Sequence, residues 1–296
     1  MTRPRVLAVV GPTAAGKSDL GVALARALGG EVVNADSMQL YRGMDVGTAK
    51  LTEAERGGVP HHLLDVWDVT VTATAAAYQV LCRERVDALL AAGTTAVLVG
   101  GSGLYLRAAL DQLDFPGTDP EVRAALEAEL DEVGPLVLHA RLAALDPAAA
   151  ERMEPTNGRR VVRALEVVAL TGQMPGRMTS YAAHYETTYV GVDRADLADR
   201  TDLRVDRMWA TGLVEEVESL LPDLRAGVTA SRALGYAQVL AMLDGTLTPD
   251  AAREATKAAT RRFVKRQRGW FRRDPRVTWL DGSAPDLVGQ AMQLAG

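Results

Sequence analysis

The stretch VLAVVGPTAAGKSDL, residues 6–20, decides the fold class of this chain. Apolar and β-branched residues lead into a loop of Gly, Pro and Ala, and after Lys17 and Ser18 the apolar residues recur at helical spacing. Residues 11–18 match the pattern G-x-x-x-x-G-K-S/T at every fixed position, in the strand–loop–helix context that this pattern requires. We therefore predict a buried strand, a phosphate-binding loop (P-loop) and a helix.

The loop predicts a site for an anion. Its backbone N–H groups and the helix start point at one spot, where the helix dipole favours negative charge. Gly16 allows the backbone to come close, Lys17 adds a positive charge, and the Ser18 hydroxyl can ligate a Mg²⁺ ion that bridges two phosphates. The alternative is a glycine turn followed by Lys and Ser by chance. The predicted diphosphate-binding residues are Gly11, Pro12, Thr13, Ala14, Ala15, Gly16, Lys17 and Ser18.

Composition indicates a globular protein. The chain has 296 residues, 48% of them hydrophobic and 24% charged, enough for one large domain and a smaller one. It contains no run of about 18 apolar residues and no small-residue cleavage region near its start, so we expect a cytoplasmic protein with no membrane partner. The single cysteine, Cys82, excludes an internal disulfide, argues against a zinc site and is typical of a small buried hydrophobe.

Strand and helix patterns alternate, which predicts an α/β fold with a parallel sheet and crossover helices. The expected strands are Arg5–Val10, Glu31–Ala35, Thr95–Val99, Thr188–Val192 and Val277–Leu280. From about Gly117 to Ala183 the sequence has Ala, Leu, Glu and Arg at helical spacing and almost no strand signal. We therefore predict a P-loop NTPase-like core formed by residues 1–116 and 187–296, with a helical insertion domain at 117–186.

Two further strand ends carry candidate site residues. The stretch VVNADSMQLYRGMDVGTAK (32–50) places Asp36 at the carboxyl end of a strand, where parallel sheets bind ligands. Asp36 could hold Mg²⁺ or act as a general base, and a helix-cap or turn Asp is the alternative. The stretch TAVLVGGSGLYLRAAL (95–110) lacks the acid that ends a Walker B strand, which weakens the case for a nucleotide hydrolase. Its glycines fit packing and function equally well, and Ser102 can donate a hydrogen bond.

The charge distribution predicts a surface for a polyanion. Residues 253–273 carry nine Lys or Arg against one Glu, a local +8 on a chain of net charge −5, which leaves −13 for the rest. A solvated basic face is one alternative, and a membrane-surface helix is disfavoured because the apolar side is rich in Ala. A stripe at helical spacing comprises Lys257, Arg261, Lys265, Arg268 and Arg272, and a smaller cluster comprises Arg159, Arg160 and Arg163.

Seven segments together resemble the bacterial tRNA dimethylallyltransferase family, in that family's order and across nearly the whole chain. They are GPTAAGKS, NADSMQLYRGMDVGTAK, VPHHLLDV, VLVGGSGLYLRAAL, NGRRVVRALEV, SRALGYAQV and RRFVKRQRGWFRR. The resemblance implies transfer of a dimethylallyl group from dimethylallyl diphosphate to N6 of adenosine 37, immediately 3′ of the tRNA anticodon, with Mg²⁺ assisting. It also implies that the insertion grips the anticodon stem-loop. We expect a monomer.

The resemblance also assigns residues. The P-loop would hold the diphosphate, Asp36 would accept an N6 proton, and Arg200 and Arg204 would reach the outer diphosphate oxygens, although Thr201 replaces a common aliphatic residue between them. The implied catalytic residues are Lys17, Ser18, Asp36, Arg200 and Arg204. The implied tRNA-binding residues are Asp36, Ser37, Met38, Gln39, Ser102, Arg123, Arg159, Arg160, Val161, Val162, Arg163, Arg232, Gly235, Tyr236, Arg261, Arg262, Lys265, Arg266 and Gln267. For His61 and His62 we favour structural hydrogen bonding over catalysis.

Three other functions remain open at this point. A small-molecule P-loop kinase shares the first motif but leaves the basic segment unexplained. A P-loop RNA-binding ATPase explains both features but requires a Walker B acid and coupling motifs that we do not find. A prenyltransferase acting on free AMP shares the donor chemistry but does not need a long basic stripe.

Overall fold

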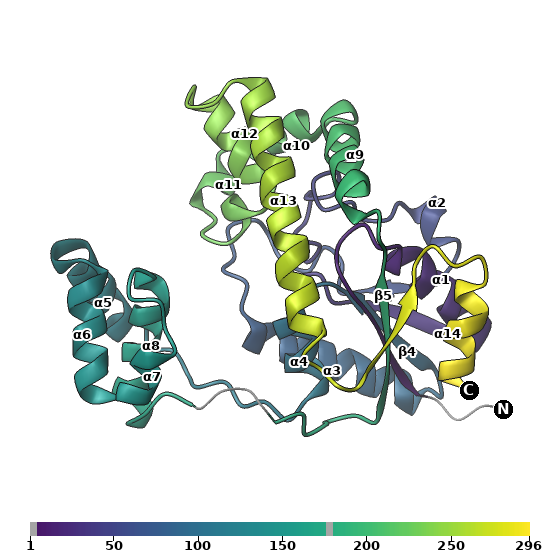
Figure 1. The fold of residues 1–296 in the computed structure, drawn as a ribbon, viewed down its shortest axis with the longest axis horizontal. Coiled ribbons are helices and arrows are strands. Elements are labelled where there is room, and N and C mark those ends of the chain that lie inside the picture. Colours follow the sequence, from purple (N-terminus) through teal and green to yellow (C-terminus); the bar gives the residue numbers. More distant parts are fainter. Residues whose placement is uncertain (1–4, 176–179) are drawn as a thin grey trace. The chain divides into compact units, whose positions relative to one another are not determined.

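The structure, a computed structural model that describes residues 5–175 and 180–296, contains a parallel sheet with helices packed on it (Figure 1). In these residues the strands are β1 (Val6–Val10), β2 (Gly30–Asn34), β3 (His61–His62), β4 (Thr95–Gly100), β5 (Thr187–Asp193) and β6 (Val277–Asp281), in the order β3-β2-β4-β1-β5-β6. Each neighbouring pair is parallel. The predicted α/β class and the five predicted strands are confirmed, whereas the two-residue β3 was not foreseen.

Helices cover both faces of the sheet. Helices α1 (Lys17–Leu28) and α14 (Leu287–Ala295) share one core with Leu7 and Val9 of β1. Helices α3 (Ala75–Ala91) and α4 (Gly103–Leu110) share the other core with Ala8 and Val10, and the buried Cys82 lies there as predicted. All of β1 is buried, because a parallel strand with helices on both sides meets no water, and this explains its uninterrupted apolar sequence.

A group of helices follows β5 (Figure 1), and residues 208–243 of this group share a core with Tyr41, Met44 and Val69. Its elements are α9 (Leu197–Ala210), α10 (Leu213–Ser219), α11 (Asp223–Ala226), the 3₁₀ turn η1 (Ala230–Arg232), α12 (Tyr236–Leu243) and α13 (Pro249–Phe271). Helix α13 begins where Thr248 caps it and Pro249 fits the first turn. It packs against α9, α12 and α4.

The short helix α2 (Glu53–Arg56) lies between β2 and β3 and starts with a capping box made by Thr52 and Glu55.

The structure divides into two compact units, Met1–Gln112 with Ala182–Gly296, and Leu113–Tyr181. The second unit consists of helices α5 (Pro120–Val133), α6 (Pro135–Leu145), α7 (Pro147–Glu151) and α8 (Gly158–Thr171) around a core that includes Leu126, Leu138 and Leu165. Residues 182–186, predicted to belong to the insertion, lie in the first unit, where the N–H of His184 donates to the carbonyl oxygen of Leu110. Residues 113–116, predicted to belong to the core, lie in the second unit. Residues 176–179 of the expected insertion lie outside the described residues.

Candidate active site

The P-loop joins β1 to α1, and its backbone has the conformation that the motif requires. Gly11 and Gly16 have φ angles of +139° and +98°, where a side chain would be strained. A Cβ atom at Gly11 would also collide with the carbonyl oxygen of Val192. Gly16 stands at the N-cap of α1 and offers no side chain to the first N–H groups of the helix. These N–H groups are therefore suited to bind an anion.

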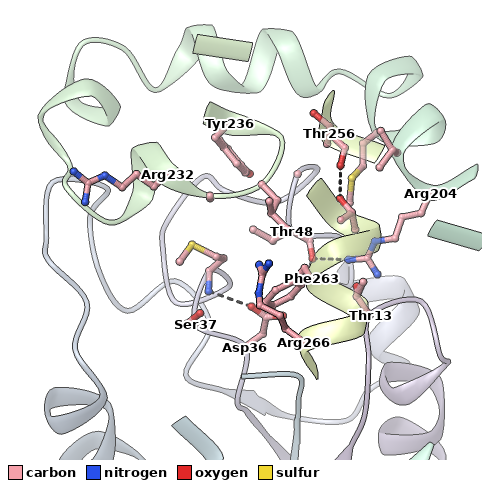
Figure 2. A pocket seen from close by; sticks show the side chains of 17 residues that line it. Thr13, Asp36, Ser37, Thr48, Arg204, Arg232, Tyr236, Thr256, Phe263 and Arg266 are labelled. Atoms are coloured by element: carbon pink, nitrogen blue, oxygen red, sulfur yellow. Dashed lines mark hydrogen bonds between the residues drawn. The ribbon is translucent and has the colours of Figure 1, made fainter. Parts of the chain in front are cut away.

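Two neighbouring cavities lie beside the P-loop, with volumes of about 280 Å³ and about 60 Å³. Thr13, Asp36 and Arg204 line both of them, so the cavities meet at these residues. Figure 2 shows the larger cavity. The larger cavity also has apolar walls, formed by Met38, Val205, Met208, Ala233, Leu234 and Phe263. Lys17, Ser18 and Gln39 line the smaller cavity. One cavity therefore offers cationic and oxygen groups, and the other offers room for an apolar or aromatic group.

The cationic groups of the smaller cavity, Lys17 and Arg204, are partly buried. Lys17 Nζ donates a hydrogen bond to the carbonyl oxygen of Pro12 at 2.6 Å. Burial lowers the pKa of Lys17 to about 8. The negative charge of nearby Asp36 acts to raise this pKa, and the positive charge of Arg204 acts to lower it. Burial also lowers the pKa of Arg204. An anion in this cavity would offset the cost of partly removing both cations from water.

Asp36 follows β2 by two residues, in a tight turn. Its Oδ1 accepts a hydrogen bond from the backbone N–H of Met38 at 3.1 Å, and its own N–H donates to Asn34. A hydrogen bond of this kind is what we expect if Asp36 is a turn residue, the alternative interpretation of its sequence. The carboxyl group nevertheless lines both cavities, which is the position that a general base between two substrates requires.

Arg200 and Arg204 project from α9 one turn apart. Arg204 donates to the carbonyl oxygen of Thr48 at 3.1 Å and lines both cavities. Arg200 donates to the carbonyl oxygen of Ala14 at 2.9 Å and thus contacts the P-loop backbone. The structure therefore places both arginines beside the loop, but only Arg204 in the cavities.

Most of the other residues that the resemblance assigned in the first unit lie close to the larger cavity. Ser37 and Met38 line it, and the Ser37 N–H donates to the hydroxyl of Ser102 at 3.0 Å. Arg232 and Tyr236 also line the larger cavity, across from Thr13 of the P-loop in Figure 2. Gly235 precedes Tyr236 at the N-cap of α12 with a φ of +90°. Gln39, in contrast, lines the smaller cavity and donates to Thr48.

The charge of α13 differs from our expectation. The segment is helical, but four stripe residues form ion pairs with carboxylates of α9 and of the end of β5, namely Lys257–Asp206 (2.8 Å), Arg261–Asp202 (2.7 Å), Arg268–Asp193 (2.7 Å) and Arg272–Asp193 (3.1 Å). The surface is therefore less positive than the sequence count suggested. Arg262, Lys265 and Arg266 are exposed, and the guanidinium of Arg266 lies 5.5 Å from the Phe263 ring centre.

Gln267 has a different place from the one that the resemblance implied. Its side chain is 4% exposed, its Oε1 accepts from the Thr13 N–H at 2.9 Å, and its Nε2 donates to the carbonyl oxygen of Gly101 at 3.0 Å. Both ends of the amide are thus used inside the protein. Gln267 therefore links α13 to the P-loop and to the turn after β4. Because both ends of its amide are already hydrogen-bonded, we do not expect its side chain to contact tRNA.

In the second unit, two assigned arginines converge on a buried carboxylate. Glu166 is fully buried and accepts from Arg123, from Arg163 at 2.7 Å and from the Asp119 N–H at 3.0 Å. Burial alone would raise the Glu166 pKa, but these hydrogen bonds outweigh it and lower the pKa. Arg159 and Arg160 are exposed at the start of α8, whereas the side chains of Val161 and Val162 are buried in the core of the unit and point away from solvent.

His61 and His62 form β3 at the edge of the sheet. Nδ1 of His61 bonds to the carbonyl oxygen of Val59, and Nε2 of His62 bonds to Glu31. The hydrogen bonding that we favoured for this pair is present, although His61 also lines the smaller cavity.

Residues 5–175 and 180–296 contain neither a candidate metal cluster nor a candidate membrane-spanning helix. No group of three or more His, Cys, Asp or Glu side chains in this part of the chain could hold a metal ion. Similarly, none of the helices described is both long and apolar enough to cross a membrane.

Several cavity residues were missed by sequence reasoning. Gly47 and Thr48 lie within the stretch that carried the resemblance, so a Gly-Thr pair in a turn beside Asp36 was the available signal. Met208, Thr256 and Phe263 come from the helices after β5, and nothing in their local sequence separates a cavity wall from an ordinary helix face.

Comparison with known proteins gives a consistent result. The family model described as IPP transferase matches residues 39–274. The chain is 64% identical over 287 residues to a protein of Streptomyces coelicolor named tRNA dimethylallyltransferase, covering 96% of this chain and 92% of the relative. It is 61% identical over 298 residues to a protein of the same name from Thermobifida fusca, covering 98% and 93%.

Solved structures agree with this result. The tRNA isopentenylpyrophosphate transferase of Bacillus halodurans matches with a TM-score of 0.72 and 38% identity, over 98% of this chain and 94% of that one. A eukaryotic dimethylallyltransferase, studied while acting on tRNA, matches with a TM-score of 0.81 and 25% identity, over 99% of this chain and 77% of that one.

Proposed function

The chain belongs to the IPP transferase family, and from this premise we propose that it transfers a dimethylallyl group from dimethylallyl diphosphate to N6 of adenosine 37 in tRNA, releasing diphosphate. The observation that carries the proposal is the similarity to tRNA dimethylallyltransferases along nearly the whole chain. The site supports it, because a cationic cavity adjoins a cavity with apolar walls. A diphosphate ester of a small hydrocarbon requires both environments.

The smaller cavity would hold the diphosphate of the donor against the P-loop. Breaking the bond between C1 and the diphosphate oxygen leaves negative charge on the leaving group and positive charge on the allylic carbon. The P-loop N–H groups, Lys17 and Arg204 are held in place before the reaction and would stabilise the negative charge as it develops. Arg200 would support the loop through Ala14 without contacting the donor.

The oxygen groups of the smaller cavity suit Mg²⁺. The side chains of Ser18, Asp36 and Gln39 line this cavity, and Mg²⁺ needs only one or two protein ligands when phosphate oxygens and water supply the others. We propose that Ser18 is the Mg²⁺ ligand. When bound, the ion would neutralise charge on the departing diphosphate.

The larger cavity would receive the dimethylallyl group of the donor and, beside it, the acceptor base. An adenine must leave the stacked anticodon loop to reach an enzyme site, and the cavity of about 280 Å³ offers aromatic and apolar walls for it. Asp36 lies where the two cavities meet, so it could accept the N6 proton while N6 is held against C1 of the donor.

Exposed cations would bind the tRNA backbone. In the first unit these are Arg262, Lys265 and Arg266, and in the second unit they are Arg159 and Arg160. Contacts with phosphates supply affinity that falls as salt rises, and they place the RNA without reading its sequence. The cytoplasmic location and the monomeric state remain predictions from the sequence.

The proposal is tested by offering the purified protein different acceptors. Labelled dimethylallyl diphosphate and Mg²⁺ are supplied with bulk tRNA, with AMP or with no acceptor, and ATP turnover is measured separately. We expect label in tRNA alone, and none with Lys17→Ala. Label in AMP would indicate a free-nucleotide prenyltransferase. ATP turnover without prenyl transfer would favour the kinase or ATPase interpretation.

A further inference from the structure

The loop of residues 44–50 forms part of the active site but is held from outside it. Gly47 and Thr48 line the larger cavity, and Ala49 lines the smaller one. The carbonyl oxygen of Thr48 accepts hydrogen bonds from Arg204 and from Gln39, each at 3.1 Å. The backbone of this loop therefore bonds directly to the Arg204 guanidinium.

A single carboxylate on α10 binds three consecutive N–H groups of this loop. Glu216 Oε2 accepts from the N–H of Asp45 at 2.9 Å and from that of Val46 at 2.7 Å, and Oε1 accepts from the N–H of Gly47 at 3.1 Å. The Tyr236 hydroxyl also donates to Oε1. A carboxylate has about four lone-pair sites, so four donors saturate it. Glu216 itself lines neither cavity.

The packing around this contact leaves the loop little freedom. A Cβ atom at Gly47 would collide with the Tyr236 ring and with Leu213, so the ring lies directly on the loop backbone. Tyr236 is fully buried and also lines the larger cavity. Glu216 thus joins the loop to α10 and α12 through hydrogen bonds whose acceptor is charged, the stronger class of hydrogen bond.

We propose that Glu216 is a positioning residue for the diphosphate site, because it fixes the 44–50 loop and through Thr48 aims Arg204 into the smaller cavity. This inference rests on the proposed function, in which that cavity receives a diphosphate. Glu216 acts through Arg204, so its contribution to ligand binding depends on the presence of that arginine. A residue that only stabilised the fold would lower stability without such a dependence.

The test is a double-mutant cycle read by calorimetric binding of inorganic diphosphate, which does not require any transfer reaction. Glu216→Gln keeps the size of the side chain but turns an NH₂ group toward N–H donors. We expect roughly tenfold weaker diphosphate binding in this variant. In an Arg204→Ala background the same substitution is expected to change binding by less than about twofold, because the group that it positions is gone.

Matched measurements separate positioning from general damage. Glu218→Gln, an exposed change on the same helix, is expected to leave diphosphate binding unchanged. Hydrogen exchange of the 44–50 segment is expected to accelerate in Glu216→Gln only. If the Gln variant does not fold, Glu216→Asp, which keeps the charge but shortens the reach, enters the same cycle with a smaller loss in the same direction.

Equal losses in the wild-type and Arg204→Ala backgrounds, or no loss in either, would overturn the role of Glu216 while leaving the proposed function intact. Failure of the wild-type protein to bind diphosphate would instead overturn the donor site, and the role of Glu216 with it.

Discussion

Binding of the prenyl donor is expected to draw a proton into the site, and Lys17 sets the size of this uptake. Burial lowers the pKa of Lys17 to about 8, so about half of these amines are neutral at pH 8 and about a tenth at pH 7. An anionic diphosphate beside the amine favours its charged form and raises its pKa. Binding at pH 8 therefore takes up about half a proton, and affinity falls about tenfold from pH 7 to pH 9.

Titration calorimetry in buffers of different ionisation enthalpy measures this uptake directly. The observed binding enthalpy is plotted against the buffer's ionisation enthalpy, and the slope is the number of protons taken up. Lys17→Arg is the matched control, because a guanidinium stays charged at pH 8 and has no proton to gain. We expect about half a proton for the wild-type protein at pH 8 and almost none for the Arg variant.

Two results would refute this reasoning. An uptake near zero for the wild-type protein at pH 8 would mean that Lys17 is already charged before the donor binds. An equal uptake in both proteins would place the titrating group elsewhere in the site.

Three further predictions concern residues with different places in the site. Asp36→Ala is expected to lower kcat by about two to four orders of magnitude with little change in calorimetric donor affinity, and a collapse of donor affinity would make Asp36 a metal or structural residue. Lys265→Ala is expected to raise KM for tRNA and to reduce the salt dependence of KM, because an exposed cation is lost. Arg268→Ala removes an ion-pair partner of Asp193 and is expected to lower the free energy of unfolding by about 1 kcal/mol. A lower melting temperature for Lys265→Ala with a raised KM for Arg268→Ala would contradict both. Gln267→Ala is expected to weaken donor binding because it frees the P-loop from α13, and a loss confined to tRNA binding would restore its predicted RNA contact.

Contiguous signals in the sequence predicted the sheet and the phosphate-binding loop. The strands β1 and β4 contain uninterrupted apolar runs, and residues 11–18 carry both the turn and the chemistry of the loop. Asp36 could be placed beside the loop, because parallel strands present their carboxyl ends at one edge of a sheet. These features depend on neighbouring residues or on one general rule of sheet geometry.

The remaining parts of the site depend on contacts between distant segments. Glu216 binds Val46 across 170 residues, and Gln267 binds Thr13 across 254. A count of charges likewise could not reveal that the basic side chains of α13 face the carboxylates of α9, because the pairing arises only when the two helices pack together. Local sequence therefore overstated the free positive charge of α13 and gave no sign of Glu216.

The identity of the modified nucleoside tests the central claim most directly. Bulk tRNA from cells that lack this modification is incubated with the protein, dimethylallyl diphosphate and Mg²⁺, then digested and analysed by mass spectrometry against synthetic N6-dimethylallyladenosine. We predict that this nucleoside appears in the fragment that contains the 3′ side of the anticodon loop, and that Asp36→Ala yields almost none in the same time. An unmodified tRNA pool, or a dimethylallyl group on another base or another part of the tRNA, would contradict the account.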